Sequence, residues 1–217
     1  MSTPLPNSSF SEDIPGLQTA WDSTSLTTFM SCPRKYQLSM IEQWNSQHQS
    51  VALTFGILFH KGMEIFEKTL AEPQDRDAAL RNAIIEILLW SSNYFDKEGI
   101  PVESWEFAPW PITDDRRNRN TLVRALIWYV SHYDPDPAQT IIFKDGRPAV
   151  ELSFKIPLPL ETPTGDHYLL CGHIDRLVRF LDQVWVLDYK TTSTTINASY
   201  FSKFSPHLQL SLYTMAA

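Results

Sequence analysis

The sequence is poor in cysteine and has no long apolar run. It contains two cysteines, Cys32 and Cys171, and in a cytosolic chain we do not expect them to form a structural disulfide. No run approaches the ~20 apolar residues that a membrane-spanning helix needs. The first 15 residues are polar, rich in Pro and Ser, and contain no apolar signal segment. We therefore expect a cytoplasmic protein that does not enter a membrane, with a flexible N-terminal lead over residues 1–20.

The sequence also lacks an excess of basic residues. Lys and Arg number 18 against 25 Asp and Glu, which gives a formal net charge of −7. This balance counts against tight nucleic-acid binding, because neutralisation of phosphates supplies much of that affinity. Basic residues still gather at Arg34-Lys35 and within residues 116–124, although the second group could be the solvated face of a helix. The hydrophobic content of 43% excludes a chain that is disordered throughout.

Apolar periodicity and turn residues predict a group of helices followed by a group of strands. The expected elements are helices near 25–41, 54–70, 76–97 and 114–132, a loop over 100–113, strands near 139–144, 149–158, 167–180 and 184–190, and a closing helix from Pro206 with Ser205 as its N-cap. The strands are expected to be mostly antiparallel. At 217 residues the chain fits one domain with a sizeable core. The predicted fold class is therefore α+β, with mixed α and β structure in one domain.

Two aspartates and a lysine flank the predicted hairpin between the last two strands. If residues 181–182 form a two-residue loop, Asp175 lies directly opposite Asp188. Leu-Asp is not a favoured pair for such a loop, which weakens the argument for this register. Side chains alternate between the faces of a strand, so Asp188 and Lys190 share one face.

Two carboxylates this close indicate a shared proton or a bound cation. Opposed strand residues have β-carbons roughly 4.5–5.5 Å apart, and like charges there repel. Hard divalent cations favour oxygen ligands of this kind, and a metal there would polarise a phosphate oxygen and activate a water. Lys190 could stabilise charge on the phosphate or orient the water. Taken alone, however, an Asp at a strand end is often a turn former, and Asp-x-Lys is often a surface ion pair.

Five short motifs follow one another along the chain. They are Ser31-Cys32-Pro33-Arg34-Lys35-Tyr36, Phe55-Gly56-Ile57-Leu58-Phe59-His60, Gly172-His173-Ile174-Asp175, Asp188-Tyr189-Lys190-Thr191-Thr192 and Gln209-Leu210-Ser211-Leu212-Tyr213. In order and approximate spacing the set resembles the RecB-like branch of the PD-(D/E)xK nuclease superfamily, with its CRISPR-associated and AddB/RecB-type exonuclease domains. The resemblance implies one nuclease domain over residues 21–217, with a restriction-endonuclease-like core whose central mixed sheet is flanked by helices.

The resemblance also implies a role for each matching position. The implied catalytic residues are Asp175, Asp188 and Lys190. The implied ligands of Mg²⁺ or Mn²⁺ are His60, Asp175, Asp188 and the backbone carbonyl of Tyr189. Gln209 and Tyr213 match a motif that places DNA near the site, and Arg34 is a further candidate for nucleic-acid binding. Gln209 and Tyr213 are four apart and share one face of the predicted closing helix, where they could instead be a half-buried surface.

Three side chains near the implied site each allow a functional and a structural interpretation. His60 adjoins an apolar helical stripe, where a histidine is often structural, although we favour it as a ligand. Glu64, one turn further on, could orient His60 or be solvated. Glu151 lies on the polar face of a predicted strand, where it could support the metal site or simply face water.

Cys32 raises the question of an iron–sulfur cluster. Some members of the family carry such a cluster, with a first ligand placed like Cys32, and it needs four thiolates. With two cysteines we expect no cluster within this chain. Cys32 would be a ligand only if the chain is truncated, which the apolar ending at Ala217 suggests. Otherwise Cys32 would be a small buried apolar residue.

These inferences favour a metal-dependent deoxyribonuclease with DNA as its substrate. The resemblance implies an exonuclease in DNA repair, recombination or CRISPR-type DNA processing, with a helicase or another recombination or CRISPR protein as a partner, in a bacterium or phage. The alternative is a catalytically inactive nucleic-acid-binding or assembly module that retains the nuclease fold, as the acidic balance would suit. A third reading is metal-dependent hydrolysis of some other phosphoester.

Overall fold

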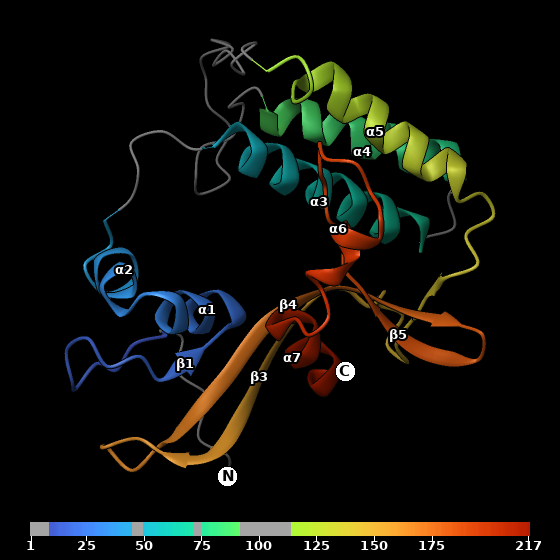
Figure 1. Ribbon diagram of the computed structural model, residues 1–217. Coiled ribbons are helices and arrows are strands. Elements are labelled where there is room, and N and C mark those ends of the chain that lie inside the picture. The colour runs from blue at the N-terminus through green and yellow to red at the C-terminus, as the bar shows by residue number, and fades with distance from the viewer. Residues whose placement is uncertain (1–8, 45–49, 72–74, 92–113) are drawn as a thin grey trace. The chain divides into compact units, whose positions relative to one another are not determined.

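The computed structural model describes residues 9–44, 50–71, 75–91 and 114–217 (Figure 1). The chain forms two compact units and passes from one to the other several times. Unit 1 comprises Met1–Gln47, Leu152–Ile174 and Asn197–Ala217, and unit 2 comprises His48–Glu151 and Asp175–Ile196. Each unit is therefore assembled from segments that are far apart in the sequence.

Three helices of unit 2 pack against one another: α3 (Val51–Leu70), α4 (Arg76–Ser91) and α5 (Arg119–His132) (Figure 1). Their common core is formed by apolar residues at helical spacing, among them Met63 of α3, which is fully buried. Gly62 permits the close contact, because a β-carbon there would lie 3.1 Å from Ile87 and 3.3 Å from Leu126. The apolar side predicted for α3 is thus its buried side. Because this side is buried, the packing also fixes where the other side chains of α3 point.

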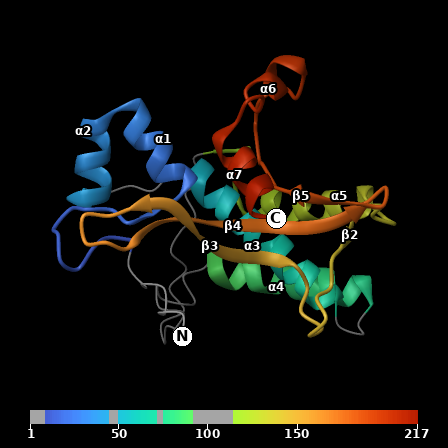
Figure 2. The same ribbon diagram turned by 90° about the horizontal axis from the view of Figure 1, so that it is seen from below.

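A mixed sheet of five strands completes the architecture. Its central strand is β4 (His167–Phe180), which pairs antiparallel with β2 (Gln139–Thr140) and β5 (Gln183–Leu187) and parallel with β1 (Ala20–Trp21). It also pairs with β3 (Val150–Glu161), and the two strands lie side by side in Figure 2. A mixed sheet flanked by helices confirms the predicted fold class.

The predicted hairpin has the predicted register. Phe180 pairs with Gln183 next to the loop, and the same register continues along the strands to the pair of Arg176 and Leu187. Leu181 and Asp182 form the loop with φ of +49° and +58°, the left-handed conformation that a type I′ turn requires at both positions. The sheet's twist therefore overrides the poor preference of Leu and Asp for this turn.

The helix predicted over residues 25–41 is wrong in one respect, because it is three short pieces. The pieces are α1 (Ser23–Ser31), α2 (Pro33–Tyr36) and a π-helical turn, η1 (Gln37–Ile41). The chain is extended at Cys32, with φ of −161° and ψ of +101°. Pro33 explains this break, since the ring of a proline disfavours helical backbone in the residue before it.

Several other predicted boundaries are also corrected. The fourth helix begins at Arg119 rather than 114, because Asn118 forms a capping box with Thr121. The third predicted helix is described as far as Ser91, and its continuation to residue 97 and the predicted loop 100–113 lie outside the described residues. The strand expected near 139–144 is limited to β2, followed by an isolated bridge between Ile142 and Pro148.

The C-terminal segment holds one helix more than predicted. α6 (Ala198–Ser202) begins where the Asn197 side chain accepts a hydrogen bond from the Tyr200 amide. The closing helix α7 (Leu208–Ala216) starts after His207, so the prediction of Ser205 as its N-cap is wrong. Both helices belong to unit 1.

Two further predictions concern the chain outside these elements. Of the expected lead, residues 1–8 lie outside the described part, whereas Phe10 and Gln18 form an antiparallel bridge. Among the described residues, no helix combines the length and apolar character required to span a bilayer.

Candidate metal-binding site

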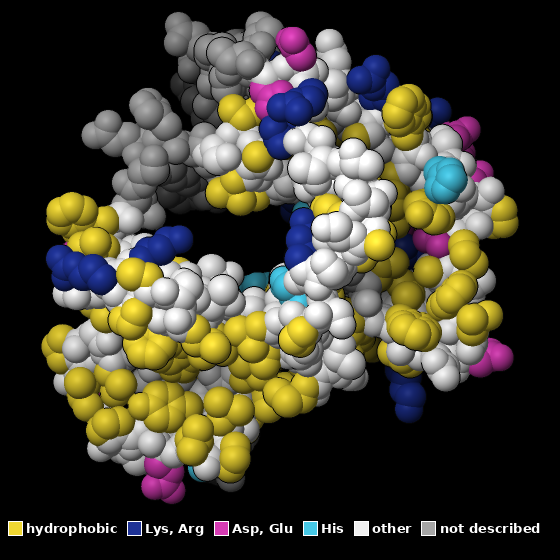
Figure 3. All heavy atoms as spheres, in the orientation of Figure 1, with side chains coloured by type: hydrophobic (Ala, Val, Ile, Leu, Met, Phe, Trp, Pro, Cys, Tyr) yellow, Lys and Arg dark blue, Asp and Glu magenta, His cyan; other side chains and the backbone are white. Residues whose placement is uncertain are grey.

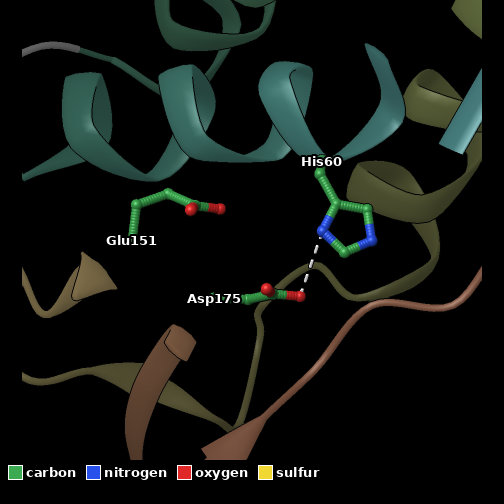
Figure 4. A group of neighbouring side chains, drawn as sticks. All are labelled: His60, Glu151 and Asp175. Carbon is green, nitrogen blue, oxygen red and sulfur yellow. Dashed lines mark ion pairs between the residues drawn. The ribbon is translucent and has the colours of Figure 1, made fainter. Parts of the chain in front are cut away.

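Three side chains of unit 2 converge from different elements (Figure 4). His60 comes from α3, Glu151 from the start of β3 and Asp175 from β4. Each offers one ligand atom, and these atoms all lie within 4.8 Å of one another. One nitrogen and several carboxylate oxygens at such spacing are a donor set that fits a divalent cation.

His60 and Asp175 are in direct contact. Nδ1 of His60 lies 3.2 Å from Oδ2 of Asp175, which is the dashed line in Figure 4. Burial lowers the pKa of His60, but the hydrogen bond and charge of Asp175, helped by a hydrogen bond to the Tyr189 backbone, outweigh burial and raise the pKa. Because only a neutral imidazole binds metal, a cation bound between the two side chains would have to displace the proton that Asp175 favours on His60.

The backbone of Tyr189 lies against the same pair. Its amide donates a hydrogen bond of 2.8 Å to Oδ2 of Asp175, which holds that carboxylate on the side of His60. The strand β5 has ended at Leu187, so the backbone at Tyr189 is released from sheet pairing and can serve the site. The structure therefore places Tyr189 beside two of the ligands predicted with it.

Glu151 lies in the cluster and is half-buried, so its surroundings fit the hypothesis of a residue that supports the metal site. Burial raises the pKa of Glu151, and the negative charges of Asp175 and Glu64 raise it further. Its φ is +52°, a left-handed conformation that is uncommon for a residue other than glycine. Such strain often marks functional positions. A bound cation would relieve the repulsion between the carboxylates.

Asp188 and Lys190 form a tight pair beside the cluster. Lys190 Nζ lies 2.9 Å from Oδ1 and 2.6 Å from Oδ2 of Asp188. Burial raises the pKa of Asp188, the contact with Lys190 lowers it, and the charge of Asp175 raises it again, for a net rise. Asp188 is thus close enough to repel Asp175, as the register predicted. Its carboxylate is held by Lys190, however, and is not one of the three grouped ligands.

Behind Asp175 lies a buried ion network that the sequence analysis missed. Arg176 contacts Glu67 at 3.1 Å and Asp136 at 3.0 Å, and the side chains of Arg176 and Glu67 are only 3% and 4% exposed. Arg176 also lies 3.4 Å from the Tyr189 hydroxyl. The network therefore supports the segment that holds Asp175. The sequence signal for this network was Glu67. It is a charged residue seven positions after His60, on the buried side of α3.

Glu64 is engaged with lysines of its own helix. It contacts Lys61 at 2.9 Å and Lys68 at 2.6 Å. Burial raises the pKa of Glu64, but hydrogen bonds from Lys68 and Lys61 outweigh burial and lower it. No described contact joins Glu64 to His60, so the structure gives no support for Glu64 as the group that orients it.

The remaining predicted residues lie in unit 1. Gln209 Nε2 donates a 3.0 Å hydrogen bond to the Tyr213 hydroxyl, so the two do share a helical face. Gly172 makes room for Tyr213, because a β-carbon there would lie 3.0 Å from its ring. Arg34 is exposed and bonds Gln37. Cys32 is exposed, so the expectation of a small buried residue is wrong, and its sulfur accepts a hydrogen bond from the Lys35 amide.

The cluster opens into a cleft of about 510 Å³ within unit 2. His60, Glu151, Asp175, Tyr189 and Lys190 all line it. A search of the curated proteins finds no match to the chain. The family model of the PD-(D/E)XK nuclease superfamily, whose members are typically nucleases that use divalent metals, matches residues 21–217. Because that match covers nearly the whole sequence, the chain belongs to the PD-(D/E)XK nuclease superfamily.

Proposed function

We propose that the chain is a metal-dependent deoxyribonuclease of the RecB-like branch that cleaves DNA as an exonuclease. The convergence of His60, Glu151 and Asp175 beside Lys190, in one cleft, carries the proposal. DNA repair, recombination or CRISPR-type processing, with a helicase or a similar protein as partner, is the setting that the motif order favours.

The donor set favours Mg²⁺ or Mn²⁺ as the cofactor. Carboxylate oxygens dominate it, and neither cysteine of the chain, Cys32 or Cys171, belongs to the cluster. A divalent cation in this place would polarise a phosphate oxygen and lower the pKa of a water. His60, Glu151 and Asp175 would hold the cation, with Asp188 and the Tyr189 carbonyl as further ligands.

The other residues of the site would act on the substrate. Lys190 lines the cleft with a side chain that is 35% exposed, so its ammonium group can approach a phosphate. There it would stabilise the charge that develops on the phosphate oxygens. Asp188 would keep Lys190 in place until substrate enters. The buried network of Arg176 and Glu67 would keep Asp175 and Tyr189 fixed during turnover.

Degradation of labelled single- and double-stranded DNA in Mg²⁺ or Mn²⁺ tests the proposal. We expect cleavage by the wild-type chain and its loss in Asp175→Asn, Asp188→Ala and Lys190→Ala. Lys144→Ala and Asp145→Ala provide matched controls, because both residues are exposed and neither lines the cleft. If the wild-type chain and all variants are equally inert with every DNA and metal, catalysis by this chain is wrong.

A second candidate is an inactive nucleic-acid-binding module with the same fold. It is favoured by the ion pair of Lys190, whose ammonium group contacts both oxygens of Asp188 and is therefore not free to act on a phosphate. Calorimetry separates the two functions. DNA binding without measurable binding of Mn²⁺ would support the module, whereas Mn²⁺ binding that Asp175→Asn removes would support the nuclease.

A further inference from the structure

The cleft beside the metal cluster has an apolar wall whose side chains lie outside the hydrophobic core. Leu53 and Ile57 of α3 and Trp90 of α4 line it and are 56%, 51% and 42% exposed. None of the three belongs to the hydrophobic core of unit 2. Figure 3 shows hydrophobic side chains gathered over the start of α3. Their exposure next to a polar site calls for a ligand with an apolar face.

Part of the wall lies on the same helix as the candidate metal ligand His60. Leu53, Ile57 and Lys61 are spaced four apart and so lie on one side of α3, and Ile57 precedes His60 by one turn. Gly56 adds no side chain between them, and a β-carbon there would meet only Thr191, at 3.5 Å. A phosphate held near His60 would therefore bring the adjoining nucleotide onto this wall.

The wall ends at a cation, Lys61, which directly follows the candidate ligand His60 and also pairs with Glu64 at 2.9 Å. Lys61 Nζ lies over the Trp90 ring, 5.4 Å from its centroid. A cation next to an exposed indole is suited to a nucleotide, because the lysine attracts the phosphate while the ring stacks on the base. The cleft volume of about 510 Å³ lies within the range of roughly 300–1,000 Å³ that holds small-molecule ligands.

We propose that Leu53, Ile57 and Trp90 form a subsite for one unstacked nucleobase next to the scissile phosphate, which makes single-stranded DNA the preferred substrate. This inference rests on the proposed function. In a duplex each base is covered on both faces by its neighbours, so it cannot reach an aliphatic and aromatic wall. Leu53 and Ile57 offer no hydrogen bond to a duplex backbone in its place.

The experiment compares two exposed tryptophans that each have a basic side chain over the ring. Trp128 of α5 is 67% exposed, with Arg124 over its ring at 5.5 Å, and does not line the cleft. Fluorescence anisotropy in Ca²⁺ would measure binding of a short oligothymidylate and of a blunt hairpin duplex. We expect Trp90→Ala to weaken oligothymidylate binding by a factor of roughly 5 to 150, Ile57→Ser to weaken it less, and Trp90→Phe and Trp128→Ala to leave it near wild type.

Each outcome supports or overturns the subsite. Equal oligothymidylate affinity in Trp90→Ala and Trp128→Ala, or wild-type binding of the hairpin as tight as that of the single strand, would overturn it; the wall would then serve a protein segment instead. Mn²⁺ calorimetry and cleavage assays on the same proteins separate this result from the proposed function. A wild type that cleaves DNA while Trp90→Ala binds normally defeats the subsite alone. A wild type without Mn²⁺ binding or cleavage, but with Trp90-dependent binding, defeats catalysis alone.

Discussion

At the scale of single residues, the site depends on competition between a proton and a cation. Contact with Asp175, 3.2 Å away, favours the protonated form of His60. That carboxylate and a hydrogen bond to the Tyr189 backbone raise the pKa of His60 against the opposing effect of burial. A protonated imidazole must lose one proton before a ring nitrogen can bind a metal.

Binding of Mn²⁺ should therefore weaken as the pH falls, over a range that begins above the ordinary histidine pKa of 6.5. A raised pKa means that the protonated form persists to a higher pH, so the proton competes with the metal earlier in an acid titration. Calorimetry of Mn²⁺ binding from about pH 8 to about pH 6 would measure it.

The control for this pH dependence is His60→Gln, which keeps a polar group but cannot be protonated. In that variant Mn²⁺ should bind more weakly at high pH and lose the dependence near neutrality, leaving only carboxylate titration at lower pH. An affinity of the wild type that is constant across this range would show that His60 is not a ligand.

At the scale of secondary-structure elements, buried charge joins α3 to the sheet. Arg176 of β4 pairs with Glu67 of α3, and the Thr140 hydroxyl of β2 donates a 2.7 Å hydrogen bond to Glu67. Burial raises the pKa of Glu67, while the charge of Arg176 and the bond from Thr140 lower it, for a net rise. Removal of Glu67 leaves the buried guanidinium of Arg176 with one acidic partner, Asp136, and breaking a buried pair costs more than the pair contributes.

Glu67→Ala should therefore lower the free energy of unfolding by about 3–5 kcal/mol, measured by urea denaturation. Asp145→Ala is the matched control, because Asp145 pairs with Arg147 on the surface, where both side chains are more than half exposed. It should leave the unfolding midpoint nearly unchanged. Equal midpoints for the two variants would contradict a supporting role for the buried network.

The same scale shows where local sequence determines structure and where it does not. The register of β4 and β5 followed from alternation along the strands, because a slip by one residue would turn every side chain to the other face. The break at Cys32 could have been read from Pro33, whose effect on the preceding residue is local. The short helix α6 was harder, because only its cap, Asn197, distinguishes it from the surrounding Ser and Thr residues.

At the scale of the whole molecule, the candidate ligands could be predicted only in part. Asp175, Asp188 and Lys190 follow from one hairpin, so their proximity is a local property of the chain. Glu151 could not be assigned in this way, since its place beside His60 depends on the folding of unit 2 and on a left-handed backbone that Glu rarely adopts. Arg176 was missed because a buried arginine gives no periodic signal in a strand.

The candidate site draws its ligands from positions 60, 151 and 175, which are close only in the folded chain. A metal that binds the native state and not the unfolded chain must therefore stabilise the fold. At a Mn²⁺ concentration of 100 times the Kd, the stabilisation should be about 2.7 kcal/mol, visible as a rise in Tm.

Asp175→Asn should abolish the rise. Asp145→Ala should retain it, since Asp145 is exposed and is not one of the cluster's members. A Tm that Mn²⁺ does not raise, or raises equally in Asp175→Asn, would show that the three side chains form no metal site, whatever the chain does with DNA.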